Sequence, residues 1–244
     1  YTNRLPCLAP PRCIIVEPLF MCDSDRTDER PSRQIRHVIW DWNGTLLDDT
    51  QAGVNAVNGM LRTRGLPLLD VARYRDIFGF PVRHFYEAVG FQLEREDWDA
   101  MAREFHDLFL AEPDLRLHRE ATNALQHFSA AGVGQSILSA SEQTILERML
   151  ATFGIQHHFT HICGVDNLYG QSKLDLGRAL LARIEVPCPQ ILLIGDSLHD
   201  HEVAEALSVR CLLISQGHQS HARLAQCGAP VLPCLSDLHD WLTQ

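Results

Sequence analysis

Residues 37–49, HVIWDWNGTLLDD, decide the fold that this sequence predicts. The apolar run from Val38 to Trp40 ends at Asp41, and a Gly-Thr turn follows closely. This pattern is typical of a buried strand in a parallel sheet, whose carboxyl end faces a ligand crevice. Gly44 lets the backbone turn away sharply, because glycine adopts φ values that other residues resist. Taken alone, the segment is equally compatible with a strand that runs into a loop with an ordinary capping acid.

The chain from Gly132 onward alternates between short apolar runs and helical periodicity. Strands are predicted at 135–139, 161–165, 190–196 and 211–215, helices at 142–153, 173–184, 202–207 and 220–227, and a terminal helical turn at 238–242. Repeated β-α units imply a parallel sheet with right-handed crossovers. We therefore predict an α/β fold with a doubly wound, Rossmann-like parallel sheet.

The region between the first strand and this alternation is helical in pattern. Helices are predicted from about residue 50 to 65 and at 71–78, 82–89, 97–110 and 115–131. The first four have no strand between them and predict an inserted α-helical bundle. The predicted division is a core domain at 35–50 and 115–244, a helical cap domain at 51–114, and a disordered tail at 1–34. One hypothesis is that the residues before Met21 come from an upstream start, which the intact mass of the protein would test.

Composition excludes several classes of partner. The net charge of −10 over 244 residues argues against general affinity for nucleic acid or for an anionic membrane surface. No apolar run approaches the roughly 20 residues that span a bilayer. The eight cysteines show no CxxC spacing, which favours free buried thiols in a reducing cytoplasm. We predict a cytoplasmic protein, either a monomer or a homodimer.

Five polar residues follow predicted strands or begin helices, all expected at one edge of the sheet: Asp41, Ser139, Lys173, Asp196 and Asp200. Each has an ordinary alternative, since serine and aspartate cap helices and a lone lysine is usually solvated. Together, three acids and one lysine would form a site for a hard divalent cation and an anion. Mg²⁺ fits, because it binds one or two carboxylates together with waters and substrate phosphate.

In this order and spacing the segments resemble the haloacid dehalogenase-like hydrolase superfamily, over roughly residues 36–240. The resemblance is carried by Asp-x-x-Gly-Thr-Leu at 41–46, Ser139 after a strand, Lys173, and Gly-Asp-x-x-x-Asp at 195–200. The helical insertion is similar to the small cap of the phosphoglycolate phosphatase and β-phosphoglucomutase branch. Most members of the superfamily are magnesium-dependent phosphatases that work through an aspartyl-phosphate.

The resemblance implies that Asp41 is the nucleophile that attacks phosphorus. It implies that Ser139, the backbone N–H of Ala140 and the charge of Lys173 bind phosphoryl oxygens, with Thr45 also in the substrate site. A carboxylate becomes an effective nucleophile when cations neutralise the phosphoryl oxygens and the attack is in line.

The resemblance also implies a magnesium site. Asp41 and Asp196 would be ligands, Asn43 would contribute its backbone carbonyl, and Asp200 would bind the metal or orient Lys173. His199 and His201 flank Asp200 in the sequence, and we expect them at the surface or behind the metal ligands.

Asn43 departs from the family pattern. Phosphatases and mutases of this superfamily usually have a second aspartate there, which protonates the leaving oxygen and then activates water. Asparagine cannot do this, and general acid–base catalysis typically contributes about 10²–10⁴-fold. The loss of this aspartate would matter less for a substrate with a good leaving group. Candidate substitutes for the missing acid are Asp48, Asp49 or an acid from the cap. A phosphonate-cleaving route is disfavoured, because residues 50–130 contain no lysine for a Schiff base.

Two functional hypotheses remain open at this point. The first is a magnesium-dependent phosphatase for a small phosphorylated metabolite, with Arg83 and His84 as the expected cap contacts to the substrate. The second is a catalytically weak or inactive protein that binds a phosphorylated ligand in a regulatory role, with Asn43 as the sign of lost turnover. A phosphomutase is less favoured, because it would need the missing acid.

Overall fold

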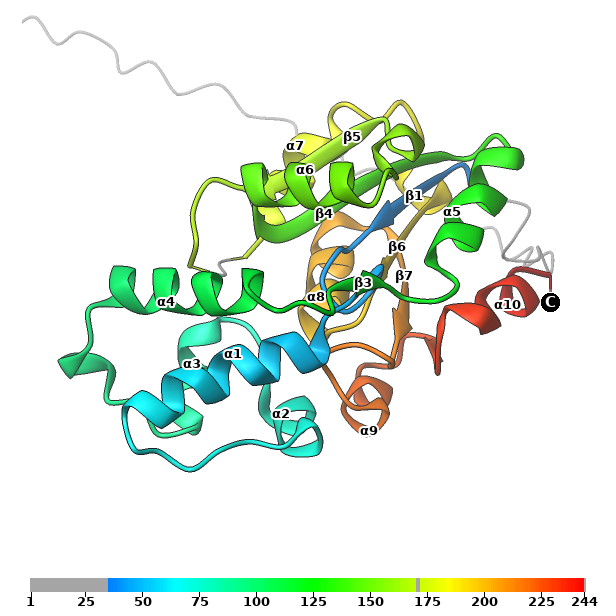
Figure 1. The fold of residues 1–244 in the computed structure, drawn as a ribbon. Coiled ribbons are helices and arrows are strands. Elements are labelled where there is room, and N and C mark those ends of the chain that lie inside the picture. Colours follow the sequence, from blue (N-terminus) through cyan, green and yellow to red (C-terminus); the bar gives the residue numbers. More distant parts are fainter. Residues whose placement is uncertain (1–34, 170–171, 244) are drawn as a thin grey trace, which may run out of the picture.

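The computed structural model describes residues 35–169 and 172–243, so the tail predicted at 1–34 lies outside the described residues (Figure 1). A six-stranded parallel sheet forms the centre, with strand order β5-β4-β1-β6-β7-β8. The strands are β1 (His37–Trp40), β4 (Gly134–Glu142), β5 (His161–Val165), β6 (Ile191–Gly195), β7 (Arg210–Ile214) and β8 (Val231–Leu232). The predicted α/β fold with a parallel sheet is confirmed.

Helices cover both faces of this sheet. Residues of α5 (Ala121–Ala130), α6 (Gln143–Thr152) and α10 (Leu238–Thr243) pack in one apolar cluster, and residues of α7 (Leu174–Leu181) and α8 (Leu198–Leu207) pack in another. Successive residues of β1 alternate between the clusters, with Val38 and Trp40 in the first and Ile39 in the second, all fully buried. An apolar run without polar interruption is therefore required, because both faces of the strand are covered.

The helices of the insertion form a third apolar cluster beside the sheet. They are α1 (Thr50–Thr63), α2 (Val71–Ile77), α3 (Val82–Ala88) and α4 (Trp98–Leu110), close to the predicted ranges. Met60 of α1, Phe85 of α3 and Met101 of α4 are buried together in this cluster. A helical insert is thus present in the fold, and the boundaries 51–114 for a separate cap domain stay a prediction.

The helix predicted at 115–131 is wrong at its start. Arg116–Leu117 form β3, which pairs antiparallel with β2 (Leu47–Asp48), and α5 begins only at Ala121. The pairing sets Leu47 opposite Leu117 and brings Arg116 to within 3.0 Å of Asp48. This contact between distant segments overrides the local helical pattern. The insertion is therefore closed at its base by a small antiparallel ribbon.

Three further predicted helices differ from the structure at their ends. The helix predicted from 202 begins at Leu198, because Ser197 caps its backbone and Asp200 completes a capping box. The helix predicted at 173–184 ends at Leu181, and that predicted at 220–227 is reduced to α9 (His221–Leu224).

The five described cysteines are free and half-buried, rather than buried as expected. In the described ranges, no helix is both long and apolar enough to cross a membrane.

Candidate active site

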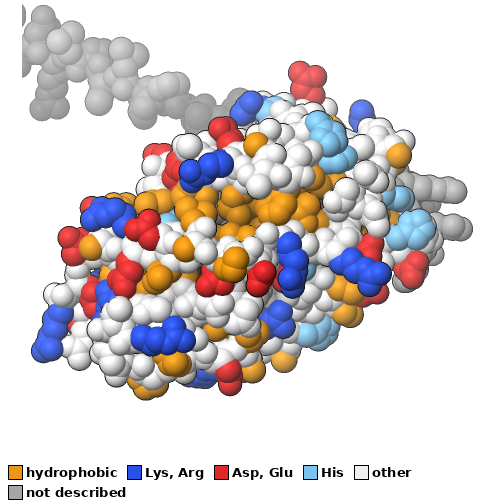
Figure 2. Space-filling model, viewed as in Figure 1, with side chains coloured by type: hydrophobic (Ala, Val, Ile, Leu, Met, Phe, Trp, Pro, Cys, Tyr) orange, Lys and Arg blue, Asp and Glu red, His pale blue; other side chains and the backbone are white. Residues whose placement is uncertain are grey.

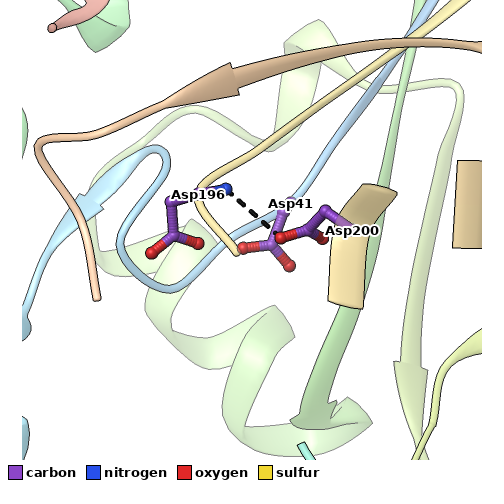
Figure 3. A group of neighbouring side chains, drawn as sticks. All are labelled: Asp41, Asp196 and Asp200. Atoms are coloured by element: carbon purple, nitrogen blue, oxygen red, sulfur yellow. Dashed lines mark hydrogen bonds between the residues drawn. The ribbon is translucent and has the colours of Figure 1, made fainter. Parts of the chain in front are cut away.

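Three buried aspartates meet at the carboxyl edge of the sheet. Asp41 follows β1, Asp196 follows the neighbouring β6, and Asp200 lies in the first turn of α8 (Figure 3). One carboxylate oxygen from each lies within 4.8 Å of the others. Asp41 and Asp196 are thus close enough to share one ion, because parallel pairing of β1 with β6 delivers both residues to the same edge.

Lys173 bridges two of these acids. It caps α7, and its ammonium group forms ion pairs with Asp41 and, at 2.7 Å, with Asp200. It also donates a hydrogen bond to the carbonyl oxygen of Leu138 at 3.0 Å. The side chain is only 3% exposed, so the alternative of a solvated helix lysine does not apply.

The backbone around the acids is fixed by short-range hydrogen bonds. Asp200 accepts hydrogen bonds from the hydroxyl of Ser197 at 2.6 Å and from the backbone N–H of Asp196 at 3.2 Å, the bond dashed in Figure 3. Gly44 has a φ of +77°, and a Cβ there would lie 2.2 Å from an Asp196 oxygen. Only glycine lets the loop after β1 pass this close to Asp196.

The acids carry more negative charge than one lysine balances. Burial raises the pKa of Asp41 to about 6, against the opposing effect of Lys173. Burial also raises the pKa of Asp196 well above its ordinary value. Although burial opposes it, Lys173 holds the pKa of Asp200 below its ordinary value. Three carboxylates and one ammonium form an incomplete cluster that a cation would complete.

The donor set fits a metal ion. Each of the three aspartates can offer an oxygen, and no histidine or cysteine belongs to the group that these described residues form. Carboxylate oxygens are hard ligands, which suit hard divalent cations better than zinc or copper. The cluster could therefore bind a metal through Asp41, Asp196 and Asp200.

The residues assigned to phosphate binding lie beside this cluster. Ser139 is buried near the end of β4, the strand next to β1, and its hydroxyl accepts a hydrogen bond from the N–H of Ser141 at 3.0 Å. The Thr45 hydroxyl lies 3.3 Å from Asp41 and 3.4 Å from Asp196. Ser139 and Ala140 line the same cavity as Asp41 and Lys173.

Asn43 is held by hydrogen bonds on both sides of its amide. Its nitrogen donates to Asp49 at 2.6 Å, and its oxygen accepts from the Ser141 hydroxyl at 2.6 Å. Asp49 also accepts from the Gly44 N–H at 2.7 Å and lies 3.1 Å from His218 Nε2. A buried carboxylate is therefore present next to position 43, on residue 49.

His218 is a site residue that the sequence pattern did not indicate. It lies in the loop after β7, and its backbone N–H donates to Asp196 at 2.5 Å. Burial lowers its pKa, but the neighbouring Asp49 raises it to about 9 overall. Its Nδ1 lies 3.1 Å from the hydroxyl of Tyr74 on α2, which links the insertion to the core. No periodicity or spacing in the sequence could have singled out this histidine.

The other candidate acid and the expected cap contacts lie elsewhere. Asp48 pairs with Arg116 on the outer ribbon. Arg83 and His84 are exposed and do not line the cavity, and Arg83 instead lies 3.6 Å from Glu87. In contrast, His199 is buried in the cavity wall, with its ring 4.9 Å from that of Phe80.

The comparisons with known proteins agree with this geometry. The model of the haloacid dehalogenase-like hydrolase family matches residues 38–214. Tyrosine-protein kinase PtkA of Mycobacterium tuberculosis is 25% identical over 203 residues, covering 79% of this chain and 66% of PtkA, just under two thirds. A phosphoglycolate phosphatase of Xanthomonas campestris is 26% identical over 187 residues, covering 75% of this chain and 85% of that protein.

Solved structures show the same fold. The haloacid dehalogenase-like protein SP0104 of Streptococcus pneumoniae has a TM-score of 0.73 at 19% identity, covering 86% of this chain and 99% of that one. The PtkA structure has a TM-score of 0.71 at 22% identity, with coverage of 86% and 99%. With the family model spanning most of the sheet and its acidic edge, the chain belongs to the haloacid dehalogenase-like hydrolase family and has phosphoglycolate phosphatase-like relatives at about 25% identity.

Proposed function

We propose that this protein is a magnesium-dependent phosphatase that hydrolyses a small phosphorylated molecule through an aspartyl-phosphate on Asp41. The observation that carries the proposal is the buried group of Asp41, Lys173 and Asp200, with Asp196 within 4.8 Å of both acids. A lone buried carboxylate would be a poor nucleophile beside a phosphate dianion. Beside a lysine and a bound cation, the phosphoryl charge is neutralised and attack becomes feasible.

In this proposal an oxygen of Asp41 forms a bond to phosphorus while the bond to the ester oxygen breaks. Lys173 and Ser139, together with the backbone N–H of Ala140, hold the phosphoryl oxygens. Asp196, Asp200 and the carbonyl of Asn43 would hold Mg²⁺, which supplies charge neutralisation. Water then attacks phosphorus, releases phosphate and restores the carboxylate.

Asn43 constrains which esters can be cleaved. A carboxamide is not acidic near neutral pH, so Asn43 has no proton to exchange with a leaving group. Its amide nitrogen donates to Asp49 and its oxygen accepts from Ser141. Position 43 therefore supplies no proton to the leaving oxygen, which departs as an anion unless Asp49 or His218 protonates it. The proposed reaction is therefore slow for alkyl esters, by up to the 10²–10⁴-fold that general acid–base catalysis typically supplies.

The direct test is release of p-nitrophenol from p-nitrophenyl phosphate with and without Mg²⁺. We expect metal-dependent turnover by the wild-type protein and a loss of at least about 10³-fold in Asp41→Asn. Asp48→Asn is the matched control, because Asp48 is on the same segment but pairs with Arg116. Turnover that survives in Asp41→Asn would contradict the covalent route.

A second candidate is favoured by Asn43 alone: a protein that binds a phosphorylated ligand without turning it over. It predicts that the wild-type protein is inert towards every phosphate ester yet gains stability from phosphate with Mg²⁺. Thermal unfolding in the presence of phosphate and the hydrolysis assay together separate the two candidates.

A further inference from the structure

The cavity of about 150 Å³ that contains Asp41 and Lys173 extends well beyond them, and its extension is apolar. Part of its wall comes from α4 and α6, which contribute Phe105, Phe109, Ile145 and Met149. Figure 2 shows hydrophobic side chains gathered on this face of the molecule between α6 and α4. An apolar wall that continues from the acidic cluster is a place for the organic part of a substrate.

Charge is confined to the other end of the cavity. Among the described lining residues, Lys173 is the only lysine or arginine, and the acids are Asp41, Asp49, Asp196 and Asp200 at the carboxyl edge of the sheet. His218, whose pKa is raised to about 9, lies at the same edge beside Asp49 and Asp196. A second anionic group on the substrate, such as the carboxylate of phosphoglycolate, would meet no cation in the apolar extension. Burying an unpaired charge there is costly.

Aromatic rings dominate the part of the wall contributed by the insertion. Phe78 and Phe80 lie with their ring centroids 5.8 Å apart, and Trp98 and Tyr86 likewise lie 5.8 Å apart, both pairs edge to face. Aromatic side chains offer large, rigid apolar surfaces that favour offset or edge contacts with another ring.

The chemistry at Asn43 independently selects the same kind of molecule. Without a proton from position 43, the ester that is cleaved most readily is one whose oxygen departs easily as an anion. A phenolic oxygen, with a pKa near 10 as in tyrosine, does so far more easily than an aliphatic alcohol, whose pKa is closer to the roughly 15.7 of water.

From these two observations we infer that the substrate is an aryl phosphate monoester whose aromatic part is uncharged and lies in the cavity between α4 and α6. The inference rests on the proposed function for the reaction itself. As the bond from Asp41 oxygen to phosphorus forms, the bond from phosphorus to the aryl oxygen breaks. The phenolate leaves with the electron pair and takes its proton from water.

Binding tests the inference without requiring turnover. The probes are 4-methylphenylphosphonate and 4-pentylphenylphosphonate, whose carbon–phosphorus bonds this route does not cleave and which differ only by four methylenes. Full burial of a methylene is worth about fourfold in affinity, from roughly 0.8 kcal/mol per CH₂. We expect calorimetry with Mg²⁺ to show at least about tenfold tighter binding of the pentyl compound. Equal affinities would overturn the inference.

A pair of variants on α4 locates the site. Ala102 lines the cavity, whereas Ala100, two residues earlier on the same helix, is exposed and does not. Ala102→Phe should reduce the ratio of the two affinities towards one, and Ala100→Phe should leave it unchanged. A ratio that is the same in both variants would place the alkyl chain elsewhere and overturn the assignment. Thermal unfolding of both variants verifies that they are folded.

Kinetics separate failure of the inference from failure of the proposed function. We expect the kcat/KM for 4-methylphenyl phosphate to exceed that for 2-phosphoglycolate by at least about 10²-fold, given the lost acid catalysis. If phosphoglycolate is the better substrate, the phosphatase proposal stands and the aryl assignment is wrong. If no ester is cleaved but the phosphonates bind with the expected ratio, the proposed reaction fails and the apolar site remains.

Discussion

The two ends of β1 bury polar side chains in opposite ways. At its start, His37 lies 2.9 Å from the Ser136 hydroxyl. The indole of Trp40, the last residue of β1, reaches back and donates at 2.9 Å to Gln135, which pairs with Val38 near the start. These partners are neutral, and each pair is complete. After its end, Asp41 joins a group of three acids that share one lysine.

This difference separates buried polar groups that only stabilise the fold from buried polar groups that can bind a ligand. A complete neutral pair satisfies the hydrogen bonds of buried groups and needs nothing more. A group with surplus charge is costly in the free protein, and it is kept where a ligand supplies the missing charge. The imbalance at the carboxyl edge, more than the burial, therefore marks the site.

Removal of the lysine between Asp41 and Asp200 should have the largest effect. In Lys173→Gln, Asp41 and Asp200 would face each other without the ammonium group between them. Breaking a buried ion pair typically costs about 3–5 kcal/mol, and we expect a fall of that order in the free energy of unfolding. Urea unfolding measures it, and Mg²⁺ should restore part of the loss.

The control for this variant comes from the other end of the strand. Gln135→Ala removes a neutral hydrogen-bond partner and should cost only about 1–3 kcal/mol, with no response to Mg²⁺. If Mg²⁺ stabilises the two variants equally, the contrast between the two ends of β1 does not hold.

Residues at strand ends were predictable from sequence because the pattern of a parallel sheet fixes where they go. Asp41 and Asp196 meet as expected, since each directly follows an apolar strand and the two strands are neighbours. Lys173 and Asp200 join them from the starts of α7 and α8. The same logic failed for β3, where pairing with β2 depends on a distant segment that no local window contains.

Side chains of the insertion were less predictable, because helix packing decides which face meets the cavity. Arg83 was expected at the substrate on the basis of its charge, yet its side chain is exposed outside the cavity.

His218 of the core was not predicted either. It reaches the site from the loop after β7 through contacts with Asp49 and Tyr74, and only the folded chain brings these residues together.

An exchange of residues 43 and 49 should restore acid–base catalysis. Asn43→Asp alone would place two carboxylates at the 2.6 Å separation now spanned by a hydrogen bond. The double variant Asn43→Asp with Asp49→Asn reverses that bond and avoids the repulsion. We expect the double variant to hydrolyse ethyl phosphate about 10²-fold faster than the wild-type protein.

The test compares the wild-type protein, Asn43→Asp and the double variant in one assay of ethyl phosphate hydrolysis. Asn43→Asp alone should gain less than the double variant, because repulsion from Asp49 displaces or protonates its carboxylate. A single variant that equals the double would show that the contact between residues 43 and 49 does not govern the chemistry.

Magnesium alone should stabilise the folded protein. A ligand that binds only the native state at 100 times its dissociation constant adds about 2.7 kcal/mol to the free energy of unfolding. We expect thermal unfolding to shift upwards with MgCl₂ and not with NaCl of equal ionic strength. Asp196→Asn should abolish the shift, since it removes one of the three carboxylates. A shift that persists in this variant would assign the metal to another site.

The smallest effect is expected at the neutral end of β1, on acidification. Burial, with a smaller contribution from nearby His161, lowers the pKa of His37 to about 4. The unfolded chain, with a histidine pKa near 6.5, binds the proton more readily, so stability falls as the pH drops from about 6.5 towards 4. At pH 4.5 the contribution of His37 to this loss is about 2 kcal/mol. Other groups titrate in the same range, so the measurement is the difference between wild type and His37→Gln in urea unfolding at pH 7 and at pH 4.5. A difference that does not change between the two pH values would mean that His37 is protonated in the folded protein, and that this end of the strand is not neutral after all.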